Sequence, residues 1–207
     1  FPYTTLFRSL QSRSHGRLFL NPATMTRSEA LELLKSHVES ERMHFHCQAS
    51  AAVMEALAIK LNQNPDDWYL AGLLHDLDVE LTRDTPNIHG HITVDLLKDK
   101  GLNPDILHAI EGHNEMAARF QRSTLFDHAL AAGETITGLI SATALVYPDK
   151  KIASVKSSSV IKRMKEKNFA ASVKRENIME IELCGISLPD FAELALNVMK
   201  EMEKSSD

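Results

Sequence analysis

The spacing of apolar residues is the sequence feature that most restricts how this chain can fold. From Met25 onward, apolar side chains recur at intervals of three and four residues, as Met54, Leu57 and Leu61 do. Such intervals place them on one face of an α-helix, whereas a half-buried strand needs strict alternation. No alternating stretch is long enough for a sheet, and no repeat or low-complexity linker divides the chain. The sequence therefore predicts an all-α fold in a single compact helical domain.

Proline, glycine and capping residues indicate where these helices begin and end. Thr26 and Glu29 form a capping-box pattern at the start of the first helix. Asn64-Pro65 separates the second helix from the third, and Gly101 suits a C-cap. The expected helices span residues 28–38, 43–61, 65–75, 88–98, 104–112, 123–146, 157–164, 176–183 and 188–202.

The first residues differ in composition from the rest of the chain. Residues 1–28 contain no acidic residue and four arginines, which is compatible with an organelle transit peptide. A second interpretation is that residues 1–9, FPYTTLFRS, resemble the in-frame translation of a sequencing adapter. We expect residues 1–24 to be a non-native or disordered N-terminal extension and residues 25–207 to form the folded domain, with Met25 as its start.

Charge and cysteine content exclude several classes of protein. The net charge of −5 argues against a dedicated binder of nucleic-acid polymers, which usually carries a basic excess. Cys47 and Cys184 lie far apart in sequence, and this predicts reduced thiols and a cytoplasmic protein. The most apolar stretch, residues 129–147, contains Glu134, so we expect a buried helix and no membrane association. Homo-oligomer formation is left open.

Histidine and carboxylate residues at apolar positions indicate a metal site. Eight of the 10 histidines lie between residues 44 and 128, and His46 falls on the apolar face of its helix. His75-Asp76 is flanked by leucines, and Glu134 is the only charged residue between His128 and Pro148. A buried carboxylate is costly unless it is paired with a cation or binds a metal. We therefore predict that His46, His75, Asp76 and Glu134, from three helices, converge on one ion.

The order of these residues resembles the HD-domain superfamily of metal-dependent phosphohydrolases, most closely small single-domain bacterial members of the HDIG type. The family pattern usually has Asp where this chain has Glu134, which is one methylene longer. The likeness covers residues 25 to about 202. It is carried by His46, by Gly72–Asp78 with the His75-Asp76 doublet, by His89-Gly90, by His113 within residues 109–115, by Glu134 within residues 129–140, and by residues 159–171.

The resemblance implies one or two divalent metal ions per chain, of Mn, Fe, Mg, Co, Ni or Zn. His46, His75, Asp76 and Glu134 would bind the first ion. His89 and His113 match positions that bind a second ion in binuclear members, and that contact phosphate or act as an acid in mononuclear ones. Asp76, His89 and His113 are therefore the candidate catalytic residues. Asp78 is a candidate to orient a ligand, although a solvated carboxylate at a helix end explains it equally well.

The same resemblance implies hydrolysis of a phosphorylated small molecule, and we expect a nucleotide or a dinucleotide. The strongly basic segment 149–175 holds nine Lys or Arg and two acidic residues. Lys162, Arg163 and Lys165 are its candidates to bind substrate phosphates, and a solvated basic helix is the plain alternative. Two other functions are also open, a non-catalytic module that senses a nucleotide and a helical structural protein whose histidines merely pack.

Overall fold

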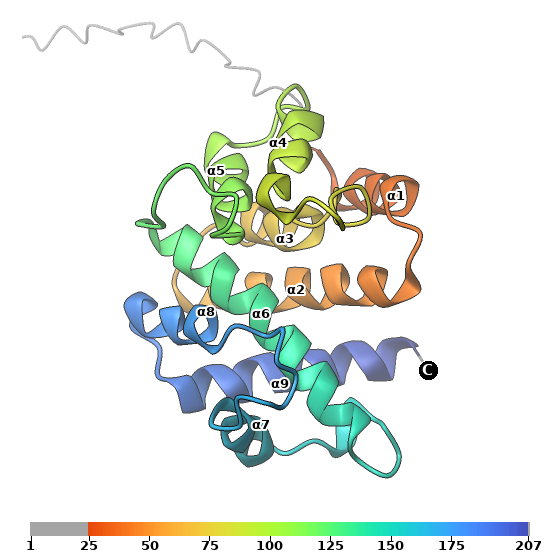
Figure 1. Cartoon of the computed structure of the whole chain (residues 1–207), viewed down its shortest axis with the longest axis vertical. Coiled ribbons are helices and arrows are strands. Elements are labelled where there is room, and N and C mark those ends of the chain that lie inside the picture. Colours follow the sequence, from red (N-terminus) through yellow and green to blue (C-terminus); the bar gives the residue numbers. More distant parts are fainter. Residues whose placement is uncertain (1–24, 207) are drawn as a thin grey trace, which may run out of the picture.

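The computed structural model describes residues 25–206, which fold into helices joined by turns (Figure 1). No strand occurs within this range, so the predicted all-α fold is confirmed. In chain order the elements are α1 (Arg27–His37), α2 (Glu41–Lys60), α3 (Pro65–Leu74), η1 (Pro86–Ile88), α4 (His91–Leu97), α5 (Pro104–His113), α6 (Leu125–Leu145), η2 (Ile152–Ser154), α7 (Ser157–Met164), α8 (Arg175–Met179), η3 (Glu180–Cys184) and α9 (Leu188–Ser206).

Local capping explains where the main helices begin. At α1 the predicted capping box is present, with Thr26 and Glu29 bonding reciprocally to each other's backbone. Asn64 caps α3. A second capping box, which the sequence analysis did not identify, joins Thr124 and Asp127 at the start of α6. These side chains satisfy amide groups that would otherwise lack a partner in the first turn of each helix.

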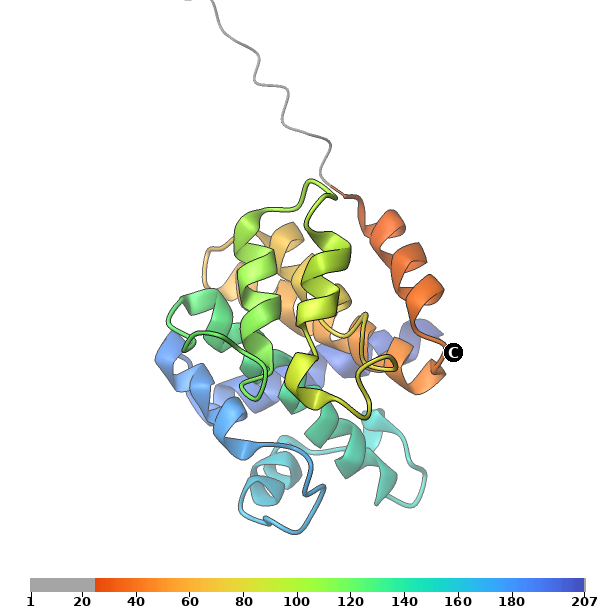
Figure 2. The ribbon, with the colours of Figure 1, turned by 45° about the horizontal axis from the view of Figure 1, so that its top comes forward.

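Two long helices, α2 and α6, organise the packing (Figure 1). α3 and α9 both pack against α2, and α6 crosses α2 and reaches α5, α7 and α8. Figure 2 shows α4 and α5 side by side. Trp68 of α3 stacks on Phe126 of α6, with ring centroids 4.9 Å apart. The largest side chains that are fully buried in this core include Leu34, Met54, Leu57, Leu70, Leu73, Leu74, Leu77, Leu97, Ile106, Ile110, Leu130 and Phe191.

Two expected helices differ from the structure. α3 ends at Leu74, so the His75-Asp76 doublet lies just beyond the helix instead of within it. The segment 176–183 is divided between α8 and the tighter η3, and Gly185 with a φ of 76° closes it. A short 3-10 turn after the last full turn of a helix is a common way for a chain to change direction.

The segment between α7 and α8, residues 165–174, forms a strap held by a single side chain. The Arg175 guanidinium donates hydrogen bonds to five main-chain carbonyl oxygens, whereas its Nε has no partner. Ala170 in the strap adopts a φ of 45°, which is a left-handed conformation. The five carbonyls belong to Arg163, Glu166, Phe169, Ala170 and Val173.

The expected N-terminal extension, residues 1–24, lies outside the described residues. Within the described part of the chain, no helix combines the length and the apolar character that a membrane span needs.

Candidate metal centre

His46 is placed on α2 so that one ring nitrogen is held and the other is left facing inward. Its Nδ1 lies 3.0 Å from the Thr137 hydroxyl, which itself donates a hydrogen bond to the Glu134 carbonyl at 2.7 Å. Because the hydroxyl proton is used in that bond, the Thr137 oxygen accepts from His46 Nδ1. The Nε2 atom of His46 then carries the lone pair, which is the form that binds a metal.

The His75-Asp76 doublet follows the last turn of α3 and lies in the interior. His75 Nδ1 is 2.9 Å from the Gly72 carbonyl, so it carries the proton and Nε2 again carries the lone pair. The His75 side chain is 1% exposed, and this burial lowers its pKa to about 3. His75 is therefore neutral at physiological pH and available as a ligand without first losing a proton.

His89 is oriented by a buried carboxylate, Asp78. Asp78 accepts hydrogen bonds from the amides of Gly90 at 2.8 Å and Thr93 at 3.1 Å, and it lies 2.7 Å from His89 Nδ1. Burial would raise the pKa of Asp78, but the bond from His89 and these two amides lower it. This arrangement agrees with the ligand-orienting role that the sequence analysis considered for Asp78.

His113 closes the set from the end of α5. Its Nδ1 lies 2.6 Å from the Ile110 carbonyl, so its Nε2 also points inward. Arg122, from the connection between α5 and α6, donates hydrogen bonds to the carbonyls of Gly112 and His113 and pairs with Glu180. These contacts fix the end of α5 and therefore the position of the His113 ring.

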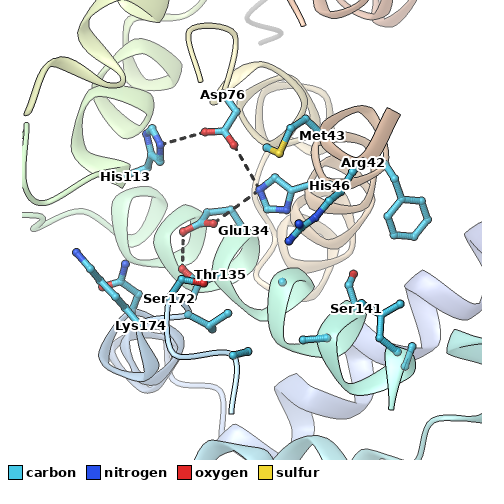
Figure 3. Close-up of a pocket in the computed structure, with 18 of the residues that line it drawn as sticks. Arg42, Met43, His46, Asp76, His113, Glu134, Thr135, Ser141, Ser172 and Lys174 are labelled. Carbon is cyan, nitrogen blue, oxygen red and sulfur yellow. Dashed lines mark hydrogen bonds and ion pairs between the residues drawn. The ribbon is translucent and has the colours of Figure 1, made fainter. Parts of the chain in front are cut away.

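The four Nε2 atoms converge on the carboxylate of Asp76. Figure 3 shows two of these histidines, His46 and His113, on either side of it. Asp76 Oδ2 faces one pair of imidazoles, at 3.6 Å from His46 and 3.4 Å from His75. Asp76 Oδ1 faces the other pair, at 3.0 Å from His89 and 3.5 Å from His113. Within each pair the two Nε2 atoms are 3.2 and 3.1 Å apart. The two oxygens of one carboxylate therefore face two different pairs of imidazole nitrogens.

Electrostatics around Asp76 favour positive charge. Burial would raise the pKa of Asp76, but His75, then hydrogen bonds from His113 and His89, then His46 hold it well below its usual range. Burial would lower the pKa of His89, yet its bonds to Asp76 and Asp78 raise it to about 10. Without a metal the centre therefore retains a proton on His89, and a metal ion bound by this imidazole would take the place of that proton.

Glu134 lies in the middle of α6, where its carboxylate reaches the first cluster. One oxygen is 3.9 Å from His46 Nε2, and the Thr135 hydroxyl donates a hydrogen bond to the other. Burial raises the pKa of Glu134, and His46 and His113 oppose that effect. The structure therefore brings the longer acid to the place where the sequence analysis expected a metal ligand.

Within the part of the chain that the structure describes, two groups of side chains have the composition and spacing to hold a divalent ion. The first is His46, His75 and Glu134, and the second is Asp76, His89 and His113, with the ligand atoms of each group within 4.8 Å of one another. Imidazole with carboxylate suits Mn, Fe, Co, Ni and Zn. The chemistry of the donor set fits such an ion, because nitrogen lone pairs this close together repel one another unless a cation or a proton lies between them.

A cavity of about 720 Å³ opens beside these clusters, and α6 forms one wall of it. Gly138, Ser141, Ala142 and Leu145 line the cavity at helical spacing beyond Glu134, so the wall becomes mostly apolar away from the histidines. The strap contributes Ala170, Ser172, Val173 and Lys174 to the lining. Parts of the basic segment 149–175 therefore line the cavity.

The basic residues predicted to bind phosphate are not the ones that reach the cavity. Lys162, Arg163 and Lys165 are absent from its lining. Arg163 instead pairs with Glu166 and lies 4.2 Å over the Phe169 ring, where it shapes the strap from outside. The difference arises because the strap, and not α7, faces the cavity.

The cations that do line the cavity are Arg42, Lys150 and Lys174, which the sequence analysis did not select. Arg42 could have been found, because it precedes His46 by four residues and therefore shares its face of α2. Lys150 and Lys174 gave no comparable signal, since loops with no regular period bring them to the cavity.

The remaining described histidines have packing or capping contacts outside the two clusters. His91 Nε2 lies 2.8 Å from the Ala117 carbonyl. His44 lies 2.6 Å from the Val38 carbonyl, His108 pairs with Asp127 and His128 with Glu180. The structure therefore separates the four converging histidines from the others.

Comparison with known proteins identifies the family. A family model described as the HD domain matches residues 44–142, a range that contains all of His46, His75, Asp76, His89, His113 and Glu134. Searches of curated proteins and of solved structures found no match to the chain. The ordered ligand set, the helical fold and this match agree, and residues 44–142 of the chain form an HD domain.

Proposed function

We propose that this protein is a metal-dependent phosphohydrolase that acts on a phosphorylated small molecule, such as a nucleotide or a dinucleotide. The observation that carries the proposal is the convergence of four imidazole Nε2 atoms on the Asp76 carboxylate. Each of these rings has its Nδ1 held by an acceptor, so the four Nε2 atoms are aimed at one place before any metal is bound.

The bound metal would supply a Lewis acid for the phosphoryl oxygens and would lower the pKa of a water molecule. The protein's own residues have separate tasks. His46, His75, Asp76 and Glu134 hold the first ion. His89 and His113 either hold a second ion or contact the phosphoryl group directly. With a single ion, His89 would be placed to donate a proton to the leaving oxygen, because Asp78 fixes its ring through Nδ1 and its Nε2 faces the centre.

The size and lining of the cavity support a small substrate. Its volume of about 720 Å³ is in the usual range for sites that bind small molecules. Polar groups cluster at the Asp76 end and apolar groups line the α6 wall, so a phosphoryl group and a less polar body would each meet a suitable surface. The acidic net charge of −5 disfavours a nucleic-acid polymer as substrate.

The test is a panel of phosphomonoesters and phosphodiesters, including nucleotides and dinucleotides, assayed with Mn, Mg, Co, Ni and Fe in turn. We expect turnover with at least one metal and a loss of at least a hundredfold in His75→Ala, together with loss of bound metal. Glu134→Asp should retain both metal and activity, because it keeps the carboxylate. Metal content in His75→Ala equal to that of the wild type would contradict the assignment of the site.

A non-catalytic nucleotide-binding module is the second candidate. It is favoured by Glu134, which is longer than the usual aspartate and accepts a hydrogen bond from its neighbour Thr135. Binding of a nucleotide by the metal-loaded protein, with no turnover of any ester in the panel, would support this function instead. Recovery of turnover in Glu134→Asp would then identify the extra methylene as the cause.

A further inference from the structure

Arg42 presents an unpaired positive charge to the cavity. It lies in the first turn of α2, four residues before His46, and therefore about 6 Å along the helix from that ligand. Both residues line the cavity, and Figure 3 shows them side by side. Among the described residues no carboxylate or carbonyl bonds to the Arg42 guanidinium. A free cation at this position is therefore available to a bound anion.

Lys150 presents a second free charge at the other end of the α6 wall. Glu134 and Leu145 lie eleven residues apart on α6, or about 16 Å, and Lys150 follows in the turn after the helix. Lys150 has a φ of 56°, and its backbone amide bonds to the Tyr147 carbonyl. Within residues 25–206, no ion pair or hydrogen bond involves its ammonium group. The carboxylate of the neighbouring Asp149 accepts hydrogen bonds from the Ser154 hydroxyl and the Lys151 amide.

The other charged groups around the opening, Lys174, Glu115 and Glu203, already have partners within the protein. Lys174 pairs with Glu115, which also accepts from Asn177. Glu203 accepts hydrogen bonds from the amides of Ile152 and Ala153 at 3.0 and 2.8 Å. Arg42 and Lys150 are therefore the two cavity cations, within the described chain, that lack an acidic partner.

The apolar face of α6 lies between the metal clusters and Lys150. Gly138, Ala142 and Leu145 expose little that could bind a polar group, and Ile152 and Val173 add to the same surface. A ligand lying along this wall would have its phosphoryl group near Asp76, would pass Arg42 about one helical turn from His46, and could reach Lys150 beyond the end of α6. The geometry favours an elongated ligand with an anionic group at each end.

We propose that the substrate carries a second anionic group, separated from the phosphoryl group that is hydrolysed by a less polar segment, and that the unpaired cations along this path bind it, Arg42 in shorter substrates and Lys150 in longer ones. The inference rests on the proposed function and adds a substrate class to it. A phosphate and a carboxylate share the chemistry that the two cations recognise, with Arg42 able to bind either one in a bidentate manner.

The experiment uses substrates that differ only at the far end. Octyl phosphate has no second anion, 1,8-octanediol bisphosphate has a terminal phosphate, and 8-phosphonooxyoctanoate has a terminal carboxylate. Each is assayed with the metal-loaded wild type, Arg42→Gln, Arg42→Lys and Lys150→Gln. Lys60→Gln is the matched control, because Lys60 is an exposed cation at the opposite end of α2. Metal content is measured for every protein.

We expect the wild type to prefer the doubly anionic substrates, with the preferred terminal group identifying the natural chemistry. Arg42→Gln should lower kcat/KM for those substrates by about ten- to a hundredfold, mostly through KM, as expected for loss of a charge-assisted hydrogen bond. Arg42→Gln should turn over octyl phosphate at the wild-type rate. On the doubly anionic substrates, Arg42→Lys should recover part of the loss in kcat/KM, and Lys60→Gln should behave as the wild type.

Two results would overturn the inference while the proposed function stands. In one, the wild type turns over octyl phosphate and the doubly anionic esters equally well. In the other, Arg42→Gln loses activity equally on all three substrates, which would place Arg42 on the phosphoryl group that is hydrolysed. A wild type that hydrolyses no phosphate ester, in this series or in the wider panel, overturns the proposed function and this inference together.

Discussion

At the scale of single residues, the partner of each imidazole Nδ1 decides what the centre can bind. Backbone carbonyls hold His75 and His113, Asp78 holds His89, and a hydroxyl holds His46. Thr137 is the least conspicuous of these partners, because threonine in a helix usually bonds only to a preceding carbonyl. Here the same oxygen also fixes the His46 ring.

Replacing Thr137 by Val should weaken metal binding by about ten- to a hundredfold, the usual effect of removing such an orienting contact. The substitution keeps the shape of the side chain and removes the acceptor of His46. Thr143→Val is the matched control, since Thr143 lies in α6 and its hydroxyl bonds only to the Leu139 carbonyl. Metal titration followed by calorimetry measures both variants. Equal affinities in the two would show that Thr137 does not orient His46.

Asp127 gives a residue-level prediction about pH. Burial would raise its pKa, but the amides of Thr124 and Ser123 and the bond from His108 lower it. A lowered pKa stabilises the fold above the usual carboxyl value, and the contribution is lost as the pH falls. Asp127→Asn should therefore cost about 1–2 kcal/mol at pH 7.

The same difference in unfolding free energy should shrink as the pH falls below about 4, where Asp127 of the wild type becomes protonated. Urea unfolding of both proteins between neutral and acidic pH measures it. A difference that stays constant over this range would show that the charge of Asp127 does not contribute to stability.

At the scale of elements, the close approach of α2 and α3 sets the distance between His46 and His75. A Cβ atom at Gly72 would lie 2.7 Å from the Ser50 carbonyl oxygen and 2.8 Å from the Ala51 backbone. Neither contact can be relieved by rotating a side chain. Gly72 therefore allows two ligand-bearing segments to pack with their backbones in contact.

Gly72→Ala should destabilise the protein by about 1–3 kcal/mol and also reduce its metal content, because α2 and α3 must move apart. Gly138→Ala is the comparison, since its added Cβ meets only the Val173 side chain at an ordinary 3.6 Å. That variant should keep or slightly raise the stability, as alanine favours a helix. Urea midpoints and metal analysis measure both, and equal losses in the two variants would contradict the packing argument.

Helical periodicity was sufficient to predict the elements and the inward faces of His46 and Glu134. It was not sufficient to predict that α3 ends before the His75-Asp76 doublet, because no local signal in the sequence marks that end. Both side chains of the doublet are nevertheless buried, as expected. The prediction that Lys162, Arg163 and Lys165 reach the substrate failed for a different reason. The strap is shaped by Arg175 contacts to main-chain carbonyls, and such contacts leave no periodic pattern in the sequence.

At the scale of the whole molecule, the candidate ligands come from segments that only the folded chain brings together. His46 and Glu134 are 88 positions apart in the sequence, yet they lie 3.9 Å apart at the centre. A metal that binds this arrangement will bind the unfolded chain much less well. Its binding free energy therefore adds to the stability of the native state.

Adding metal at about a hundred times its dissociation constant should stabilise the protein by about 2.7 kcal/mol. For a chain of this size the melting temperature should then rise by about 5–10 °C. His75→Ala should show little of this shift, and a chelator should reverse it in the wild type. Differential scanning calorimetry measures the effect, and an equal shift in His75→Ala would indicate that the metal binds elsewhere.

The way Arg175 holds the strap has a consequence for how specificity can change over evolution. Because the guanidinium binds carbonyl oxygens, which every amino acid provides, the course of the strap depends little on its own side chains. Ala170, Ser172 and Val173 can then be exchanged while the wall that they form keeps its place, with glycine or asparagine suited to the left-handed position at Ala170. Substitutions in the strap can then change the shape of the cavity without replacing any residue of the two metal-ligand clusters. The strap is therefore the natural target for a randomised library.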